Sequence, residues 1–141
     1  MDTMDQKLIN LLKNNAREST TALARMLGLS RSTVHDRILR LEDRGIIAGY
    51  TIRLNADYNK RQITAHVLMQ LNPKFADQIL QSLKKMPLIK AAYAVSGIYD
   101  MIVLVKAETT GEIDKTLDEI GRMEGIKKTT SSIVLSTKFE L

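Results

Sequence analysis

The sequence predicts an α+β protein made of two domains, residues 1–60 and 61–141. Two observations predict this organisation. Apolar residues recur at helical spacing from Met4 to Gly45, whereas the alternation typical of strands appears from Ile63 onward, between further helical segments. The apolar pattern vanishes over residues 55–62, which marks the junction. A chain of 141 residues buries about 68% of the surface that its unfolded form exposes, so two small domains can fold without disulfides or metals.

The composition excludes several classes of protein. Hydrophobic residues make up 44% of the chain and charged residues 26%, which is typical of a globular protein rather than a disordered or membrane-spanning one. Cysteine is absent, which excludes disulfides, thiolate nucleophiles and sulfur-ligated metals. The acidic start, Met1 to Asp5, is unlike a secretory leader. We therefore expect a cytoplasmic protein with no cofactor, no metal, no catalytic residues and no membrane partner.

Three helices are predicted in the first domain, from apolar stripes of helical period over residues 4–15, 19–27 and 31–43. Polar residues that cap helix N-termini stand before two of them, namely Asp2 or Thr3 for the first helix and Ser30 for the third, and the second helix is expected to start at Ser19 or Thr20.

The second and third of these helices predict a helix-turn-helix. This motif needs a small residue where the two helices cross and a glycine in the turn between them. Ala24 and Gly28 supply both, and Val34 follows on the core face of the third helix. Residues 46–54 read as extended chain, so we expect a winged helix-turn-helix that ends in a linker strand.

The outward face of the third helix is typical of a DNA-binding surface. Residues 17–44 contain six arginines and no lysine, and the planar guanidinium group binds phosphates and guanine edges through two parallel hydrogen bonds. Small hydroxyls, a histidine and arginines near a helix N-terminus suit insertion into the major groove. We predict double-stranded DNA as the partner, and the candidate DNA-binding residues are Arg25, Ser30, Arg31, Ser32, Thr33, His35, Asp36, Arg37 and Arg40.

Among these residues, Arg31, Arg37 and Arg40 are expected to dominate the affinity for DNA. Phosphate repels a carboxylate, so Asp36 is expected either to pair with Arg40 four residues later or to accept a hydrogen bond from cytosine. The alternative for the whole surface is an ordinary solvated face of a three-helix bundle.

The second domain is predicted to contain strands and helices in the order β-α-β-β-α-β. Its predicted strands cover residues 63–71, 88–96, 99–107 and 129–139, and its predicted helices begin at Pro73, capped by Asn72, and after the capping residue Thr109. A tight turn at Gly97 and Ile98 is expected between the two central strands. Such a ferredoxin-like domain is a four-stranded antiparallel sheet with both helices on one face.

The other face of this sheet has no helix to cover it. Its apolar side chains, out of phase with the helix-facing set, are predicted to be Leu68, Ala92, Ala94, Ile102, Leu104 and Val134. An uncovered apolar face of several hundred Å² is rare in a monomer. We therefore expect a homodimer, which presents two helix-turn-helix motifs to a pseudo-palindromic site.

Four motifs in the chain carry a resemblance to a known family, and they are Met1-Asp2-x-x-Asp5, Leu23-Ala24-Arg25-Met26-Leu27-Gly28-Leu29-Ser30, Val34-x-x-Arg37-Ile38-x-x-Leu41-Glu42-x-x-Gly45-Ile46-Ile47-x-Gly49-Tyr50 and Val95-Ser96-Gly97-Ile98-Tyr99-Asp100. With these motifs the whole chain resembles the Lrp/AsnC family, the feast/famine transcription regulators of bacteria and archaea. The resemblance implies a sequence-specific, nucleoid-associated regulator. It also implies that the C-terminal domain, of the RAM type, binds an effector and assembles dimers, often into octamers.

The family resemblance further implies that an amino acid or a related small effector binds between dimers, near the loop between the central strands. Carried over by position, the effector-binding residues are Gly97, Ile98, Tyr99 and Asp100, together with Ser131, Ser132 and Ile133. Glycine lets backbone N–H groups approach a carboxylate, and Asp100 can accept a hydrogen bond from an α-ammonium group. The alternative for residues 97–100 is a plain hairpin turn.

Two other functions fit parts of the pattern. Some haem-precursor decarboxylases share this fold, but the chain has only two histidines, His35 and His66, and no glycine motif of a hydrolase, an NTPase or a dinucleotide-binding enzyme. RNA-recognition modules share the β-α-β-β-α-β order, but they stack bases on aromatic side chains of the sheet. Here the central strands offer only Tyr93 and Tyr99, so the sequence favours a DNA-binding regulator.

Overall fold

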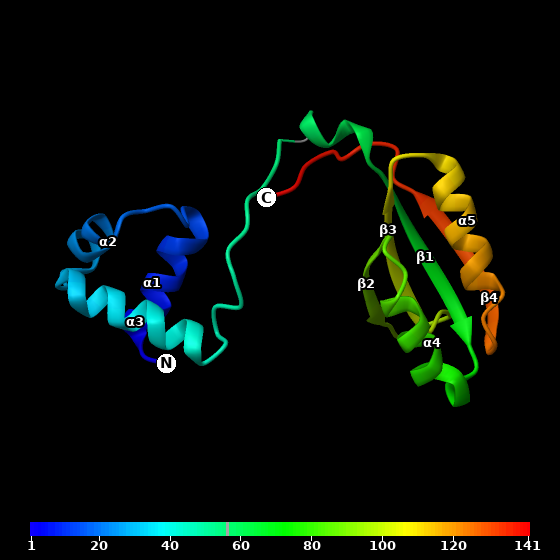
Figure 1. Ribbon diagram of the computed structural model, residues 1–141, viewed down its shortest axis with the longest axis horizontal. Coiled ribbons are helices and arrows are strands. Elements are labelled where there is room, and N and C mark those ends of the chain that lie inside the picture. Colours follow the sequence, from blue (N-terminus) through cyan, green and yellow to red (C-terminus); the bar gives the residue numbers. More distant parts are fainter. Residues whose placement is uncertain (56) are drawn as a thin grey trace. The chain divides into compact units, whose positions relative to one another are not determined.

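The computed structural model describes residues 1–55 and 57–141, and the chain divides into two compact units, Met1–Arg53 and Leu54–Leu141. We call these the N-terminal unit and the C-terminal unit; Figure 1 shows the elements of each. The division precedes the predicted boundary after residue 60, because the 3₁₀ turn η1 (Tyr58–Arg61) leads directly into the first strand. Ala56, inside the predicted junction, lies outside the described residues.

The N-terminal unit contains the three predicted helices, which are α1 (Thr3–Asn14), α2 (Thr20–Leu27) and α3 (Arg31–Asp43). The helices α1 and α3 begin at predicted caps, and α2 begins at Thr20, one of its two predicted starts, with Ser19 as its cap. The carboxylate of Asp2 accepts from the backbone N–H of Asp5, and the hydroxyls of Ser19 and Ser30 accept from N–H groups three residues later. Capping satisfies donors that the first turn of a helix leaves without partners.

The turn between α2 and α3 has the geometry that the sequence predicts. Gly28 has φ +67°, in the left-handed region that favours glycine, and the N–H of Leu29 donates to the carbonyl of Ala24 over 3.0 Å. Ala24 and Val34 are both buried where the two helices meet, in a core completed by Leu8, Leu23 and Leu41. The helix-turn-helix is therefore confirmed.

The predicted wing is not present in the described residues. Residues 46–55 form neither helix nor strand, and the N–H groups of Ile46 and Ile47 instead donate back to the carbonyl of Leu41, over 2.9 and 3.0 Å. A wing needs two strands that pair with each other, and this segment offers only one. A lone strand leaves its backbone N–H and C=O groups without partners.

The C-terminal unit has the predicted β-α-β-β-α-β order. Its elements are β1 (Ile63–Leu71), η2 (Pro73–Phe75), α4 (Ala76–Lys84), β2 (Ile89–Ala94), β3 (Met101–Ala107), α5 (Thr110–Gly121) and β4 (Ile126–Ile133). The strands lie in the order β2-β3-β1-β4, and every neighbouring pair is antiparallel. No helix among residues 1–55 and 57–141 is long and apolar enough to cross a membrane.

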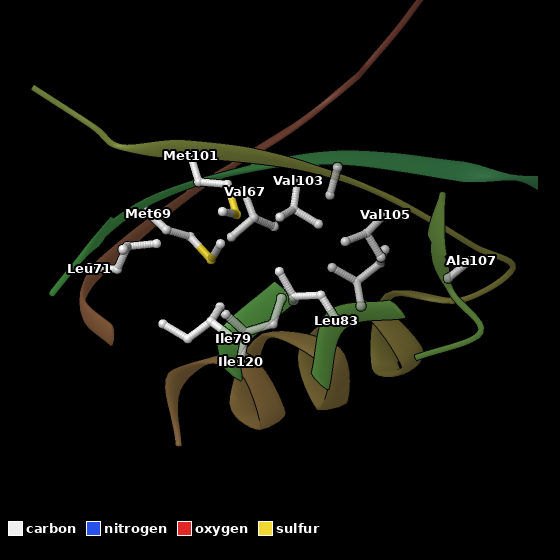
Figure 2. Close-up of a cluster of buried hydrophobic side chains, with 12 residues drawn as sticks. Val67, Met69, Leu71, Ile79, Leu83, Met101, Val103, Val105, Ala107 and Ile120 are labelled. Carbon is white, nitrogen blue, oxygen red and sulfur yellow. The ribbon is translucent and has the colours of Figure 1, made fainter. Parts of the chain in front are cut away.

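The core of the C-terminal unit lies between one face of the sheet and the two helices. Side chains from the central strands, such as Val67 and Val103, project toward Ile79 and Leu83 of α4 and Ile120 of α5 (Figure 2). Alternate residues of β1 and β3 are fully buried here, as the period-two pattern predicts.

Three element boundaries differ from the prediction. The helix after Asn72 opens as the 3₁₀ turn η2, and the residues from Val95 to Asp100 form a longer connection in place of a tight turn. The strand β4 is displaced toward the N-terminus relative to the predicted residues 129–139. It ends at Ile133 because its partner β1 begins at Ile63, and the last bond runs from the Val134 N–H to the Thr64 carbonyl.

The open face of the sheet, opposite the helices, carries the half-buried apolar side chains of Leu68, Ile102 and Leu104. The register of β2 does not support the prediction that Ala92 and Ala94 belong to this face, although Ala94 lines a hollow together with Leu68 and Ile102. A register shift between Ile89 and Ala91 moves β2 by one residue. Ala92 and Ala94 consequently pair with core-facing residues of β3, and Tyr93, opposite Ile102, takes the place on the open face. Val134 lies beyond the end of β4.

Candidate nucleic-acid interface

Helix α3 has one buried and one solvent-exposed side. Val34 and Leu41 are 0% and 1% exposed and anchor it to α1 and α2. Most of the predicted DNA-binding residues of α3 are exposed, namely Arg31, Ser32, His35, Asp36 and Arg40, while Thr33 is half-buried. The structure therefore gathers these residues on one side of a helix that is fixed from behind.

Hydroxyl groups form a small network at the start of α3. The Ser30 Oγ lies 2.7 Å from the Thr33 Oγ1 and 3.2 Å from the Ser32 Oγ, and it accepts from the Thr33 N–H. This network fixes the first turn of the helix, so Ser30 acts as a cap as well as a candidate contact. The predicted Arg25, on α2, is exposed.

A shallow hollow of about 470 Å³ follows the exposed side of α3, lined by Thr33, Asp36, Leu39 and Arg40. The expected pairing of Asp36 with Arg40 is not found: the ion pairs within 4.0 Å among residues 1–55 and 57–141 both belong to Arg37. The Asp36 carboxylate and the Arg40 guanidinium are consequently open to solvent.

Arg37 is placed differently from the other arginines of α3. Its Nη1 lies 2.8 Å from the Oδ2 of Asp2 and 2.9 Å from the Oδ1 of Asp5, and its side chain is only 18% exposed. The two carboxylates raise the pKa of Arg37 above its usual value. The pKa of Asp2 falls to about 2, mainly through the N–H of Asp5 and then through Arg37. This geometry does not fit the predicted DNA contact, because the guanidinium is already engaged by two carboxylates of α1 and its cap.

Two exposed residues of the same surface are absent from the sequence-based candidates. Leu39 lines the hollow, and Arg44 is the last residue of the arginine-rich segment, at the C-terminal cap of α3. The spacing along the helix does place Leu39 opposite Val34, but its apolar side chain kept it out of the predicted contacts. The arginine count could have shown Arg44. Glu42, beside them, accepts a hydrogen bond from the Tyr50 hydroxyl over 2.8 Å.

A second hollow, of about 670 Å³, lies on the C-terminal unit. It is lined by Leu68, Ala94, Val95, Ser96, Ile98, Tyr99 and Ile102. Two of the predicted effector-binding residues, Ile98 and Tyr99, contribute directly to it. Gly97, in the same connection, has φ +113°.

Four hydrogen bonds hold this connection to the end of β1 and to β4. The Gln70 Nε2 donates to the Ile98 carbonyl over 2.9 Å, and the Tyr99 hydroxyl lies 2.9 Å from the Thr130 Oγ1. The Asp100 N–H donates to the Met69 carbonyl, and the Asp100 Oδ2 accepts from the Leu71 N–H. One oxygen of Asp100 thus accepts a hydrogen bond within the fold, and the other accepts none from the described residues.

The three predicted effector-binding residues of β4 do not lie together. Ser132 pairs with His66, on the open face, whereas Ser131 and Ile133 pair with the core-facing residues Val67 and Ala65. Since paired residues share a face of the sheet, Ser132 alone is on the side of the second hollow. Thr130, which contacts Tyr99, was missed, although the period of two places it on that side.

Neither surface resembles a metal centre. Among residues 1–55 and 57–141, no group of three or more His, Asp or Glu side chains is arranged to hold a metal ion.

Two family models match the chain. One, described as the AsnC-type helix-turn-helix domain, matches residues 1–42; the other, described as the Lrp/AsnC ligand binding domain, matches residues 64–140 and alone covers more than half of the chain. The chain belongs to the Lrp/AsnC family. The predicted function, a helix-turn-helix transcriptional regulator of this family, is confirmed, and the enzyme alternative is not favoured.

Individual relatives can be aligned with this chain over almost their whole length. The HTH-type transcriptional regulator LysM of Saccharolobus solfataricus is 33% identical over 99% of this chain and 96% of its own. The HTH-type transcriptional regulator FL11 of Pyrococcus furiosus is 30% identical over 99% of this chain and 93% of its own. A solved structure, the feast or famine regulatory protein of M. tuberculosis complexed with L-methionine, matches with a TM-score of 0.85 and 28% identity over 99% of this chain and 95% of that one.

Proposed function

We propose that this regulator binds double-stranded DNA through the exposed side of α3, acts as a homodimer, and responds to an amino acid or a related small molecule. The observation that carries the proposal is the two-sided character of α3. Val34 and Leu41 fix the helix to the unit, while Arg31, His35 and Arg40 are exposed and take no part in the ion pairs found among the described residues. A rigidly held helix with cations at its surface suits the major groove.

The DNA-contacting set that we propose is the predicted one without Arg37, which is bound by Asp2 and Asp5. Its members are Arg25, Ser30, Arg31, Ser32, Thr33, His35, Asp36 and Arg40. Phosphate contacts by the arginines supply affinity that falls as salt rises, and the polar groups near the start of α3 are placed to reach base edges.

The open face of the sheet supports a homodimer. An apolar row crosses the adjacent strands β1 and β3 and consists of Leu68, Ile102 and Leu104. Tyr93 lies beside this row on β2. Burial of this row against a second copy removes apolar surface from water, and a two-fold pair brings two copies of α3 to one DNA. Further association into octamers, and residence in the cytoplasm on the nucleoid, are part of the same proposal.

The effector site that we propose is the part of the second hollow that the connection from Val95 to Asp100 lines, at the border of the proposed dimer face. The relative from M. tuberculosis is complexed with L-methionine, which makes amino acids the first ligands to test. Gly97 leaves room for a carboxylate to approach the backbone, and the free oxygen of Asp100 can accept from an α-ammonium group. Ser132, from the open face of β4, completes the proposed set.

Fluorescence anisotropy with a pool of genomic fragments tests the DNA-binding proposal, and calorimetry with the twenty amino acids tests the effector. Binding that weakens steeply with salt, together with heat from at least one amino acid, is expected. If an amino acid changes the affinity for DNA, DNA must change the affinity for that amino acid by the same factor. Absence of binding to any duplex at low salt contradicts the first part, and absence of heat with all twenty contradicts the second.

A further inference from the structure

The part of α3 farthest from the core carries hydroxyl, acidic and apolar side chains rather than arginines. At about 100° per residue, Asp36 and Leu39 lie about 30° to either side of the direction opposite Val34 and Leu41. Ser32 and Asp43 lie closer still, each about 10° from that direction. Arg40 and His35 each lie about 70° from that midline, on opposite sides, and Arg31 lies beyond His35. The cations therefore flank the midline of the exposed side.

We propose that Asp36 and Leu39 read base edges in the major groove, and that Arg31 and Arg40 bind the phosphates on either side. This inference rests on the proposed insertion of α3 into DNA. In such an insertion the midline of the helix meets the floor of the groove, where the bases are, and the flanks meet the two backbones.

The Asp36 carboxylate can interact favourably with a base edge but not with the phosphates of the DNA backbone. Its carboxylate has no cation within 4.0 Å among the described residues, since both ion pairs there belong to Arg37. Near phosphates an unpaired carboxylate is repelled, whereas the floor of the major groove offers the N4 amino group of cytosine as a hydrogen-bond donor.

Leu39 fits the same floor through apolar contact. It is 42% exposed and, unlike its neighbour Ile38, stays outside the buried cluster of the N-terminal unit. A single exposed leucine is common on protein surfaces and carries little weight alone. Here it lines one hollow together with Asp36, Thr33 and Arg40. The apolar group that the major groove presents to such a side chain is the C5-methyl of thymine.

The spacing of the two residues predicts where their bases lie. Asp36 and Leu39 are three residues apart, which is about 4.5 Å along the helix axis. Successive base pairs are separated by about 3.4 Å. Each half-site should therefore hold a cytosine and a thymine in adjacent base pairs, each on either strand.

The test begins with selection of preferred duplexes from a random pool by the full chain. Affinity is then measured on the selected duplex and on the same duplex with deoxyuridine in place of each thymine, which removes only the methyl group. We expect one thymine in each half-site at which this change weakens the wild type about fourfold, and about tenfold or more when both half-sites are changed. Leu39→Ala should bind the thymine duplex as weakly as the wild type binds the uracil duplex, and it should not respond to the change.

Asp36→Asn supplies an independent readout, because asparagine pairs with adenine rather than cytosine. Repeating the selection with this variant should convert one cytosine of the half-site to adenine. Met26→Ala, at a 54% exposed apolar residue of α2, serves as the matched control and should keep both the affinity and the thymine response. Thermal melting of each variant confirms that the helices are intact.

The outcomes separate this inference from the proposed function. Salt-dependent DNA binding with no loss at any uracil position, or a thymine response that persists in Leu39→Ala, overturns the role of Leu39 and leaves DNA binding by α3 in place. An unchanged cytosine preference in Asp36→Asn overturns the role of Asp36. Failure of the wild type to bind any duplex overturns the proposed function itself.

Discussion

The Nη1 of Arg37 lies 2.8 Å from the Oδ2 of Asp2, so an arginine of α3 holds the residue that caps α1. The two residues are 35 positions apart in the sequence. Asp5, in the first turn of α1, accepts from the same nitrogen and also joins Asp2 in a reciprocal cap. One guanidinium thus fixes the start of α1 and the orientation of the helix that carries the proposed DNA contacts.

Replacing Arg37 by methionine should destabilise the N-terminal unit without removing a DNA contact. Asp2 and Asp5 lose their shared cation, so we expect the melting temperature, followed by far-UV circular dichroism, to fall. The slope of log affinity for DNA against log salt should stay the same, because no phosphate contact is lost. Arg44→Met, at the exposed end of α3, is the control for stability. A decrease of the slope by about one in Arg37→Met would show that Arg37 binds phosphate after all.

The Asp2 carboxylate should make the free energy of unfolding of the N-terminal unit depend on pH in the acid range. Its pKa in the folded chain is about 2, below the ordinary 3.8, so the ionised form favours folding at pH values above 3.8. That contribution is lost as the pH falls from 3.8 toward 2 and the carboxylate takes up a proton. Urea unfolding across this range should show a smaller pH dependence for Asp2→Asn than for the wild type. Equal pH dependence in both chains contradicts the interaction.

A lysine on the open face of the sheet should separate the homodimer. Ile102 lies in the middle of the apolar row, between Leu68 and Tyr93. In Ile102→Lys a charge would be buried at the centre of the interface, and we expect light scattering to report a monomer at micromolar concentration. Asp114→Lys, on the exposed side of α5, adds a lysine away from this face and should leave the assembly unchanged. A wild type that is itself monomeric at this concentration would refute the role of the open face.

Asp100→Asn separates the two roles of this residue. Asparagine still offers an oxygen to the Leu71 N–H, so the connection from Val95 to Asp100 should keep its conformation. The negative charge available to an α-ammonium group is lost, and amino-acid affinity measured by calorimetry should fall about tenfold or more. Tyr99→Phe, which removes the bond to Thr130 but no charge, is the comparison. Equal affinity in wild type and Asp100→Asn would place the α-ammonium elsewhere.

Local patterns of the sequence predict most of the N-terminal unit. The caps Ser19 and Ser30, the left-handed Gly28 and the small Ala24 act over a few residues, so the helix-turn-helix follows from neighbours along the chain. Arg37 could not be predicted in the same way. Its partners are far away in the sequence, and its helical position alone does not distinguish an arginine that is open to solvent from one that is half-buried and paired with carboxylates.

In the C-terminal sheet, too, local sequence patterns predict some features, whereas others depend on pairing between distant segments. Alternation predicts β1 to the residue, but the phase of β2 depends on an irregularity between Ile89 and Ala91 that arises only when it pairs with β3. The extent of β4 likewise depends on where β1 begins. For this reason the carried-over residues Ser131 and Ile133 fall on the helix side, while Thr130 contacts Tyr99 on the other side.

The salt dependence of DNA binding by Arg40→Ala tests most directly whether the exposed side of α3 binds duplex DNA. Affinity for the selected duplex should be measured by anisotropy over a series of salt concentrations, for the wild type, for Arg40→Ala and for the control Arg122→Ala, which lies in the C-terminal unit. We predict a steep negative slope that becomes shallower by about one in Arg40→Ala and is unchanged in the control. Identical slopes and affinities for all three chains would contradict the claim.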